Sequence, residues 1–241
     1  MSINSKKIFV TNHYKFLDKI VYKKRIEIAD LINKETKNFE LNDALDIGTT
    51  EDNKNESSNT IIKSLKRAKV FKSISNQDIK SSFFEKKLNK SITKDFTKIE
   101  LEEFSSDIVL SNATIEHVGN QQKQRKMLDN IIKLSKKVFV ISTPNRSYPI
   151  DFHTKIPFIH WLPKNLHRKI LKIIGLSFYA KVENLNLLNK KDLILFMKEY
   201  NLDYKIYDIK LFNLSTNLIL IGIKKKFRFW NLNFYYQLKI F

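Results

Sequence analysis

The stretch Asp107–Asn120, DIVLSNATIEHVGN, places a short apolar run between an acidic residue and a group of small polar residues. The run Ile108–Leu110 suits a strand that is buried on both faces, as the strands of a parallel sheet are. Such sheets bind ligands beyond the carboxyl ends of their strands, where the strand order reverses. The polar exit Ser111-Asn112-Ala113 is therefore expected to face a ligand crevice.

Short apolar runs alternate with helical patterns over the rest of the chain. Besides Asp107–Asn112, the predicted strands are Ala44–Gly48, Ala68–Ile74, Ser91–Phe96, Lys137–Ser142, Tyr204–Phe212 and Asn217–Lys224. Helical patterns fall at Tyr14–Asn33, Thr60–Leu65, Asn76–Leu88, Gln121–Ser135, Pro163–Ile174 and Asp192–Tyr200. The short turn Asn213–Thr216 makes the last two strands antiparallel neighbours. The pattern predicts an α/β fold with a mostly parallel seven-stranded sheet, one reversed strand near an edge, and helices on both faces.

Composition excludes several classes of function. The chain of 241 residues contains no cysteine, so disulfides, zinc-thiolate sites and a cysteine nucleophile are ruled out. Neither a signal peptide nor an apolar stretch long enough to span a bilayer is found. We therefore expect a cytoplasmic protein, with peripheral attachment to the inner membrane face as an alternative.

The formal net charge of +19 has two interpretations. One is a polyanionic partner, either nucleic acid or an anionic membrane surface. The other is compositional drift, because the lysines are scattered and the chain has only four glycines and four prolines. Drift is expected to account for most of the charge.

The chain divides into a helical N-terminal cap (1–40), a main domain (41–226) and an aromatic, basic tail (227–241). All four prolines fall between Pro144 and Pro163, which marks 144–176 as a substrate-side insertion. Its aromatic and titratable groups suit a substrate pocket, and an ordinary surface connection is the alternative. The candidate substrate residues are Arg146, Tyr148, His153 and Trp161.

The helix predicted at Pro163–Ile174 is amphipathic and basic, a pattern that suits a membrane interface or packing on the same domain. Three roles are considered for the aromatic side chains of the tail. In order of preference, they pack over the sheet edge, insert among the lipid headgroups of a membrane, or stack on nucleic-acid bases.

This order of elements resembles the class I methyltransferases that use S-adenosylmethionine, over about Leu41–Lys224. Three stretches carry the resemblance: LDIGTT at Leu45–Thr50, DIVLSNATIEHVGN at Asp107–Asn120 and VFVISTPN at Val138–Asn145. The resemblance implies a Rossmann-like fold and S-adenosylmethionine as the cofactor. Methyl transfer from a sulfonium depends largely on proximity and orientation, so no metal is expected.

The resemblance also implies cofactor contacts. Asp46 and Gly48 would shape the turn near the amino-acid end of the cofactor, where glycine allows close backbone approach. The family usually has two further glycines in this loop; here Thr49 and Thr50 follow instead, so Thr49 is expected to reach the cofactor.

Further cofactor contacts are implied after the next strands. The second strand ends without the acid that binds the ribose, and Asp78 is the substitute. Asp95 and Phe96 take the adenine position, and Ser111 and Asn112 meet the cofactor at the fourth strand.

Two titratable residues follow the fourth strand. His117 is the predicted proton-handling group, because imidazole titrates near neutral pH, and capping the helix near Gly119 is its alternative role. Glu116 is interpreted as a helix-start acid.

Three functions follow in order of preference. The first is S-adenosylmethionine-dependent methyl transfer to a small-molecule or lipid-linked acceptor. The second is a catalytically inactive binding module with the same fold, suggested by the glycine-poor loop. The third, a nucleic-acid methyltransferase, is the least expected, because the chain lacks the Asn/Asp-Pro-Pro-aromatic motif of many DNA amino-group methyltransferases.

Overall fold

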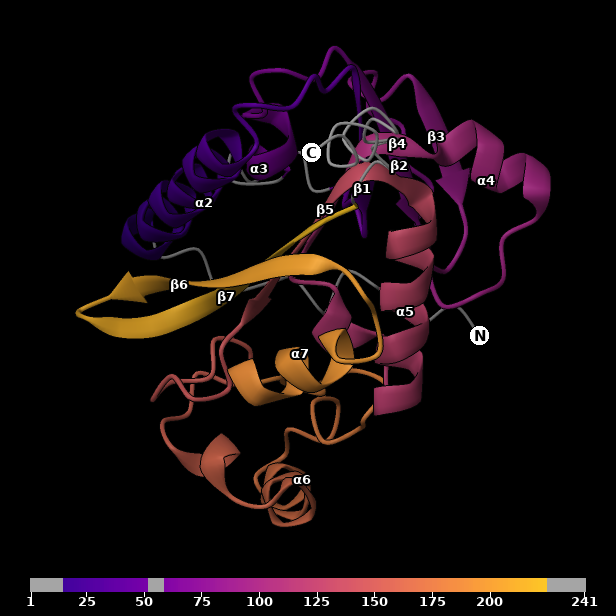
Figure 1. Cartoon of the computed structure of the whole chain (residues 1–241). Helices are drawn as coiled ribbons and strands as arrows, with labels where there is room; N and C mark the ends of the chain where they lie inside the picture. The colour runs from indigo at the N-terminus through magenta and orange to yellow at the C-terminus, as the bar shows by residue number, and fades with distance from the viewer. Residues whose placement is uncertain (1–14, 52–58, 225–241) are drawn as a thin grey trace, which may run out of the picture.

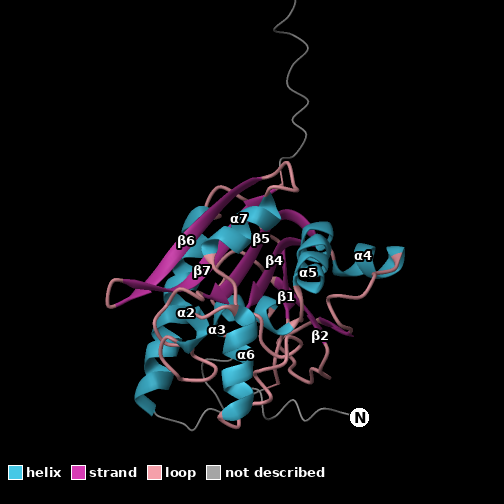
Figure 2. Cartoon of the chain, turned by 90° about the horizontal axis from the view of Figure 1, so that it is seen from below, coloured by secondary structure: helices cyan, strands magenta, loops and turns pink. Residues whose placement is uncertain are grey.

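The computed structural model describes residues 15–51 and 59–224. They form a seven-stranded sheet in the order β3-β2-β1-β4-β5-β7-β6, with helices on both faces (Figures 1 and 2). The strands are β1 Asp43–Ile47, β2 Val70–Ser75, β3 Lys86–Asn89, β4 Ser106–Asn112, β5 Ser135–Pro144, β6 Asp203–Leu211 and β7 Leu214–Ile223. Only β7 runs antiparallel to its neighbours β5 and β6. The predicted sheet with one reversed strand is confirmed.

The strand order reverses between β1 and β4. From β1 the chain proceeds outward to β2 and β3, whereas β4 lies on the other side and is followed by β5. Ala44 pairs with Ile108 and Ile47 with Ser111, so the carboxyl tips of β1 and β4 lie level. This is the position at which open α/β sheets bind their ligands.

The helices pack in two layers. They are α2 Lys15–Glu35, α3 Thr60–Lys63, α4 Lys98–Phe104, α5 Gln121–Leu134, α6 Lys164–Ile173 and α7 Lys190–Met197. Helices α4, α5 and α7 cover one face of the sheet, and α2 and α3 cover the other (Figure 2). Helix α6 lies past the carboxyl end of β5, at the bottom of Figure 1.

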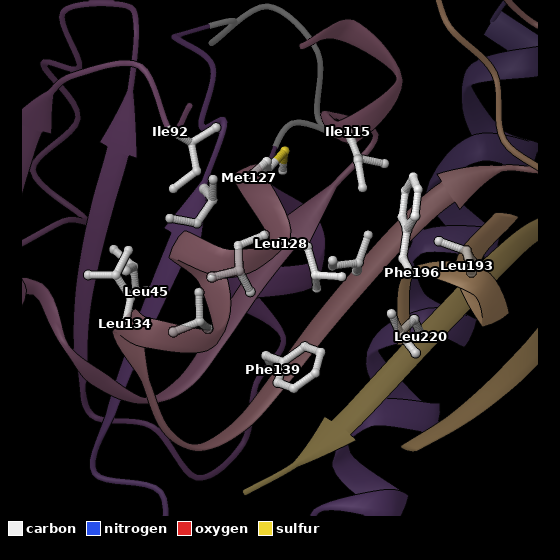
Figure 3. Packing of buried hydrophobic residues seen from close by; sticks show 14 of the residues in the cluster. Leu45, Ile92, Ile115, Met127, Leu128, Leu134, Phe139, Leu193, Phe196 and Leu220 are labelled. Atoms are coloured by element: carbon white, nitrogen blue, oxygen red, sulfur yellow. The ribbon is translucent and has the colours of Figure 1, made fainter. Parts of the chain in front are cut away.

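Helix α5 shows how sequence pattern and packing agree. The Asn120 side chain accepts a hydrogen bond from the Lys123 amide at 3.0 Å and caps the first turn. Met127, Leu128 and Ile131 then face the sheet and are buried against it (Figure 3). Because Asn120 is the cap, the capping role considered for His117 is wrong.

The third strand was predicted in the wrong place. The structure has β3 at Lys86–Asn89, and Ser91–Phe96 forms a turn and loop. The helix predicted over Asn76–Leu88 is also absent from those residues. Strand β3 is a short edge strand whose lysines Lys86 and Lys87 are exposed, and charged edge strands lack the apolar run that marks a buried strand.

The antiparallel hairpin is tighter than predicted. Phe212 and Asn213 alone form the turn, with φ of 49° and 63°. Positive φ at both central residues is the geometry that matches the twist of two antiparallel strands. Strand β7 therefore begins at Leu214 rather than Asn217.

Glycine is required where β7 crosses a core aromatic ring. Gly222 pairs directly with Phe139, and a Cβ atom there would lie 2.0 Å from Phe139 Cζ. Gly222→Ala is therefore expected to lower the free energy of unfolding by about 1–3 kcal/mol, the usual range for overpacking. Urea denaturation measures the loss. Phe139→Leu in the same chain should restore part of it, and an undiminished stability of Gly222→Ala would contradict the packing.

Some predictions concern residues that the structure does not describe. The aromatic tail 227–241 and the first residues of the N-terminal cap lie outside the described residues. Among the described helices, none has both the length and the apolar character needed to cross a bilayer.

Candidate active site

The tip of β1 presents a buried carboxyl group. Asp46 is buried and accepts a hydrogen bond from the Thr49 hydroxyl, with 2.7 Å between Oγ1 and Oδ2. Burial raises the pKa of Asp46 from 3.8 to about 6, against the opposing effect of the Thr49 hydrogen bond. The ionised carboxyl group therefore costs free energy at neutral pH, and the positive charge of Arg25 offsets this cost only in part.

Gly48 makes a close contact possible beside this carboxyl group. Its φ is +86°, and a Cβ atom at this position would lie 2.2 Å from Thr114 Oγ1. Thr114 in turn donates to the Ile47 carbonyl at 3.3 Å. The backbone at Gly48, after β1, thus packs directly against the side chain of Thr114, after β4. No residue larger than glycine fits at position 48.

The polar side chains at the strand tips have different roles. Ser111 is fully buried and donates to the Ile47 carbonyl at 3.2 Å, which ties β4 to β1. Asn112, one residue further, is half-buried at the edge of the tip. At the end of β2, Ser75 donates to the Thr49 carbonyl at 2.8 Å and so braces the first loop.

Three predicted cofactor residues lie further out. Asp78 is exposed beyond the end of β2. Asp95 is exposed and forms an ion pair with Lys126 of α5. Phe96 packs against the core, and the Lys90 ammonium lies 4.9 Å from its ring centre. Their contact with the nucleoside stays a prediction. For Asp95 and Phe96 it was made for a third strand that ends earlier than expected, at Asn89.

Two histidines meet above the tips of β4 and β5. His117 lies in the 3-10 turn η1, Ile115–His117, and His153 lies in the loop after β5. Their Nε2 atoms are 3.2 Å apart. The Nδ1 atom of His117 lies 2.6 Å from the Asn184 carbonyl oxygen, and that of His153 lies 2.9 Å from Asp151 Oδ1. Each ring is thus oriented by a separate acceptor.

Glu116 completes this cluster. It is fully buried, and its Oε2 accepts a hydrogen bond from the Thr143 hydroxyl of β5 at 2.9 Å. Its Oε1 has no hydrogen-bond partner and lies 3.9 Å from His117 Nε2. The interpretation of Glu116 as a helix-start acid is wrong, since α5 begins at Gln121 and Glu116 points inward to the histidines.

The surroundings shift the pKa values of the two histidines in opposite directions. Burial lowers the pKa of His117, although the neighbouring Glu116 opposes it. Burial also acts on His153, but the hydrogen bond and charge of Asp151 outweigh it and raise the pKa of His153. Burial would raise the pKa of Asp151, yet its bonds to His153 and Thr154 bring it to about 2.

A small basic hollow lies beside the cluster. Its basic lining side chains are Arg146, Lys164, His167 and Arg168. Tyr179 also lines it, and the Tyr179 ring centre is 6.3 Å from that of His153, which links the hollow to the histidine pair. Sequence reasoning had singled out Arg146 alone. On α6, His167 and Arg168 follow Lys164 by three and four residues, and that spacing was the available signal.

Tyr148 and Trp161, the two aromatic residues predicted to contact the substrate, lie in different environments. Tyr148 is buried, and its ring stacks on Phe152 with centroids 5.3 Å apart. Trp161 is 50% exposed and meets Phe158 edge to face at 4.9 Å. Only Tyr148 is enclosed, so the two rings do not form one pocket wall.

Comparison with known proteins shows similarity in structure only. No family model matches the sequence, and no curated protein matches it. A magnesium protoporphyrin IX methyltransferase from Synechocystis with bound SAH shares 11% identity, with a TM-score of 0.53, over 91% of this chain and 92% of that one.

Two further solved structures are similar. The N-methyltransferase NodS from Bradyrhizobium japonicum, in complex with S-adenosyl-L-homocysteine, has a TM-score of 0.56 at 10% identity, over 92% of this chain and 96% of that one. The small RNA methyltransferase HEN1 has a TM-score of 0.54 at 10% identity, over 83% of this chain and 25% of that one. The fold is that of the class I S-adenosylmethionine-dependent methyltransferases.

Proposed function

We propose that this chain transfers a methyl group from S-adenosylmethionine to a small-molecule or lipid-linked acceptor that carries an anionic group. One observation carries the proposal: the buried Asp46–Gly48–Thr49 turn and the Glu116–His117–His153 cluster sit at neighbouring strand tips, at the point where the strand order reverses. A cofactor and an acceptor held there would lie side by side.

The β1 tip fits the amino-acid end of the cofactor. The Asp46 carboxyl group would face the cofactor's ammonium group. The turn at Gly48 is held in place by its close packing against Thr114. The bound cofactor supplies an electrophilic methyl group. The chain's own contribution is to orient both molecules, to exclude water, and to handle the acceptor's proton at the His117–His153 pair.

The basic hollow supports an anionic group on the acceptor. Burial lowers the pKa of Lys164, and the neighbouring cations Arg146 and Arg168 lower it further, although Asp192 opposes them. A phosphate or carboxylate would relieve this crowding of positive charge. The buried Nε–H group of Arg168 also has no hydrogen-bond partner, which leaves a donor for such a group.

Exposed apolar side chains on η2 (Ile159–Trp161) and α6 support a lipid-linked acceptor. Ile173 is 75% exposed, and Leu166 and Ile174 lie on the same helical face. Phe158 holds a φ of 63°, unusual for a bulky residue, and its ring meets Trp161 at the surface. Strained backbone at an exposed aromatic pair is a feature of functional surfaces.

The same surface predicts membrane attachment. The exposed Lys169 and Lys172 lie beside the apolar face of α6, so anionic vesicles should bind more protein than neutral vesicles. Ile173→Ser combined with Trp161→Ala should lower cosedimentation with phosphatidylglycerol vesicles several-fold. Phe212→Ser removes an aromatic side chain that is 85% exposed at the hairpin tip and serves as the control. Equal cosedimentation with neutral phosphatidylcholine vesicles would contradict the prediction.

Calorimetric titration with S-adenosylmethionine and S-adenosylhomocysteine tests the proposed function. We expect binding of one equivalent, and acceptor-dependent production of S-adenosylhomocysteine in a screen of phosphate-bearing and carboxylate-bearing acceptors. Absence of binding by the folded protein would overturn the cofactor assignment. Binding without turnover on any acceptor would favour the inactive binding module, and turnover on RNA or DNA would favour the nucleic-acid alternative.

A further inference from the structure

The two histidines of the cluster turn their Nε2 atoms toward each other. His117 Nδ1 lies 2.6 Å from the Asn184 carbonyl oxygen, which can only accept, so Nδ1 carries the hydrogen. His153 Nδ1 donates in the same way to Asp151 at 2.9 Å. In the neutral form of each ring the lone pair therefore sits on Nε2, and the two Nε2 atoms are 3.2 Å apart. Two lone pairs at that distance repel unless a proton or a metal ion lies between them.

A third donor points to the same place. Glu116 is fully buried, and its Oε1 has no partner although Oε2 is held by Thr143. A buried acceptor without a partner is costly and calls for an explanation. Oε1 and the two histidine nitrogens all lie within 4.8 Å of one another. These donors belong to segments that are 36 residues apart in sequence.

We infer that Glu116, His117 and His153 bind one divalent transition-metal ion. Zinc binds histidine nitrogen at about 2.0–2.1 Å, so two nitrogens of a tetrahedral site lie about 3.3 Å apart. The separation of the two Nε2 atoms here is 3.2 Å. Two imidazoles and one carboxylate are the ligand set of open zinc sites and of non-haem iron sites, which keep positions for a further ligand.

The surroundings are those of a metal site. Ligating histidines usually donate their other N–H to a carboxylate or a backbone carbonyl, and Asp151 and Asn184 supply one of each. Glu116 and Asp151 provide two carboxyl groups, enough to neutralise a dication in a protein of net charge +19. No metal was expected from the sequence, because methyl transfer does not require one; the Glu116, His117 and His153 side chains nevertheless form a suitable ligand set.

The role of the ion rests on the proposed function, whereas its binding does not. With the Nε2 atoms of His117 and His153 on the ion, this pair would no longer take the acceptor's proton. The ion would instead bind the acceptor's oxygen and lower the pKa of its hydroxyl group, so that the proton leaves more readily to solvent. The basic hollow would hold the anionic group of the same acceptor. This narrows the acceptor to one that presents an oxygen ligand, such as a hydroxyl group beside a phosphate or carboxylate.

Calorimetric titration of zinc and manganese into the full, untagged chain after dialysis against chelator tests the site. We expect one equivalent of at least one of these ions to bind. His153→Ala and Glu116→Gln should each weaken binding by at least about 100-fold, and Asp151→Asn by about 10–100-fold. His160→Gln removes another buried histidine from the same loop and should bind as the wild type does, because His160 contacts the Tyr148 carbonyl and not the cluster.

A spectroscopic measurement covers the case in which a variant does not fold. Cobalt added to the metal-free wild-type protein should give the intense visible absorption of a four- or five-coordinate site, and zinc should abolish it. No binding of zinc, manganese or cobalt by the folded wild type, or unchanged affinity in both His153→Ala and Glu116→Gln, overturns the inference. The cofactor titration is run on the same metal-free protein: cofactor binding without metal binding rejects only the metal site, and the reverse rejects only the proposed function.

Discussion

Gly48→Ala is expected to lower the free energy of unfolding by about 2–5 kcal/mol and to weaken S-adenosylmethionine binding at least tenfold. Left-handed backbone costs a residue with a side chain about 1–2 kcal/mol, and overpacking adds about 1–3 kcal/mol. Both apply here, because φ is +86° and the new Cβ atom would lie 2.2 Å from Thr114 Oγ1. Relief of the clash moves the turn that we propose to face the cofactor.

Gly175→Ala is the matched control for this variant. Gly175 also has a positive φ, of +82°, but no atom lies within 4 Å of the position that its Cβ atom would take. It should therefore lose only the backbone contribution and keep cofactor binding. Urea denaturation and calorimetry measure the two effects. If the two alanine variants lose equal stability, the close packing of Gly48 against Thr114 is wrong.

Asp46→Asn is expected to stabilise the protein at neutral pH by up to about 3 kcal/mol while weakening cofactor binding. The folded pKa of about 6 exceeds the ordinary value of 3.8, so the folded state binds the proton more tightly. Stability of the wild type therefore falls as pH rises from about 4 to 6, and the full penalty is present above pH 6. A shift of this size corresponds to about 3 kcal/mol, since one pKa unit is about 1.4 kcal/mol.

Asp43→Asn, at the other end of β1, is the control variant, for which a change in stability of opposite sign is expected. Burial raises the pKa of Asp43, but its bonds to Lys72 and to the Asp107 amide outweigh burial and lower it. Its contribution to stability is present at neutral pH and is lost as pH falls, so the variant should be less stable at pH 7. Denaturation of both variants between pH 4 and pH 7.5 separates the cases. A difference between wild type and Asp46→Asn that does not grow over this range would contradict the prediction.

The combination of higher stability and weaker binding is the expected mark of a functional residue. A buried carboxyl group that costs free energy would be replaced readily if it served only the fold. The presence of such a group at the tip of β1, with Thr49 as its hydrogen-bond donor, fits the proposal that Asp46 serves a cationic ligand. A loss of stability in Asp46→Asn at neutral pH would remove this argument for the cofactor site.

Several parts of the site could be predicted from local sequence patterns. The turn at Asp46 and Gly48 was identified because a buried strand that ends in glycine has a recognisable composition, and His117 was identified because it follows a strand tip. Strand β3 was missed for the complementary reason. It is short, charged and at the sheet edge, so its position is decided by pairing with β2 and not by an apolar run. The positions assigned to Asp78, Asp95 and Phe96 depended on these strand ends.

The sequence by itself determined the parallel sheet, its one reversed strand and the turn after β1, because burial on two faces and the need for positive φ act on consecutive residues. Only the tertiary structure decided that Glu116 points inward, that its Oε1 has no partner, and that His153 meets His117 across 36 residues. Such contacts depend on where separate loops meet above the strand tips. The pattern of residues along the chain cannot predict the distance between His117 and His153, because that distance follows from the packing of the whole domain.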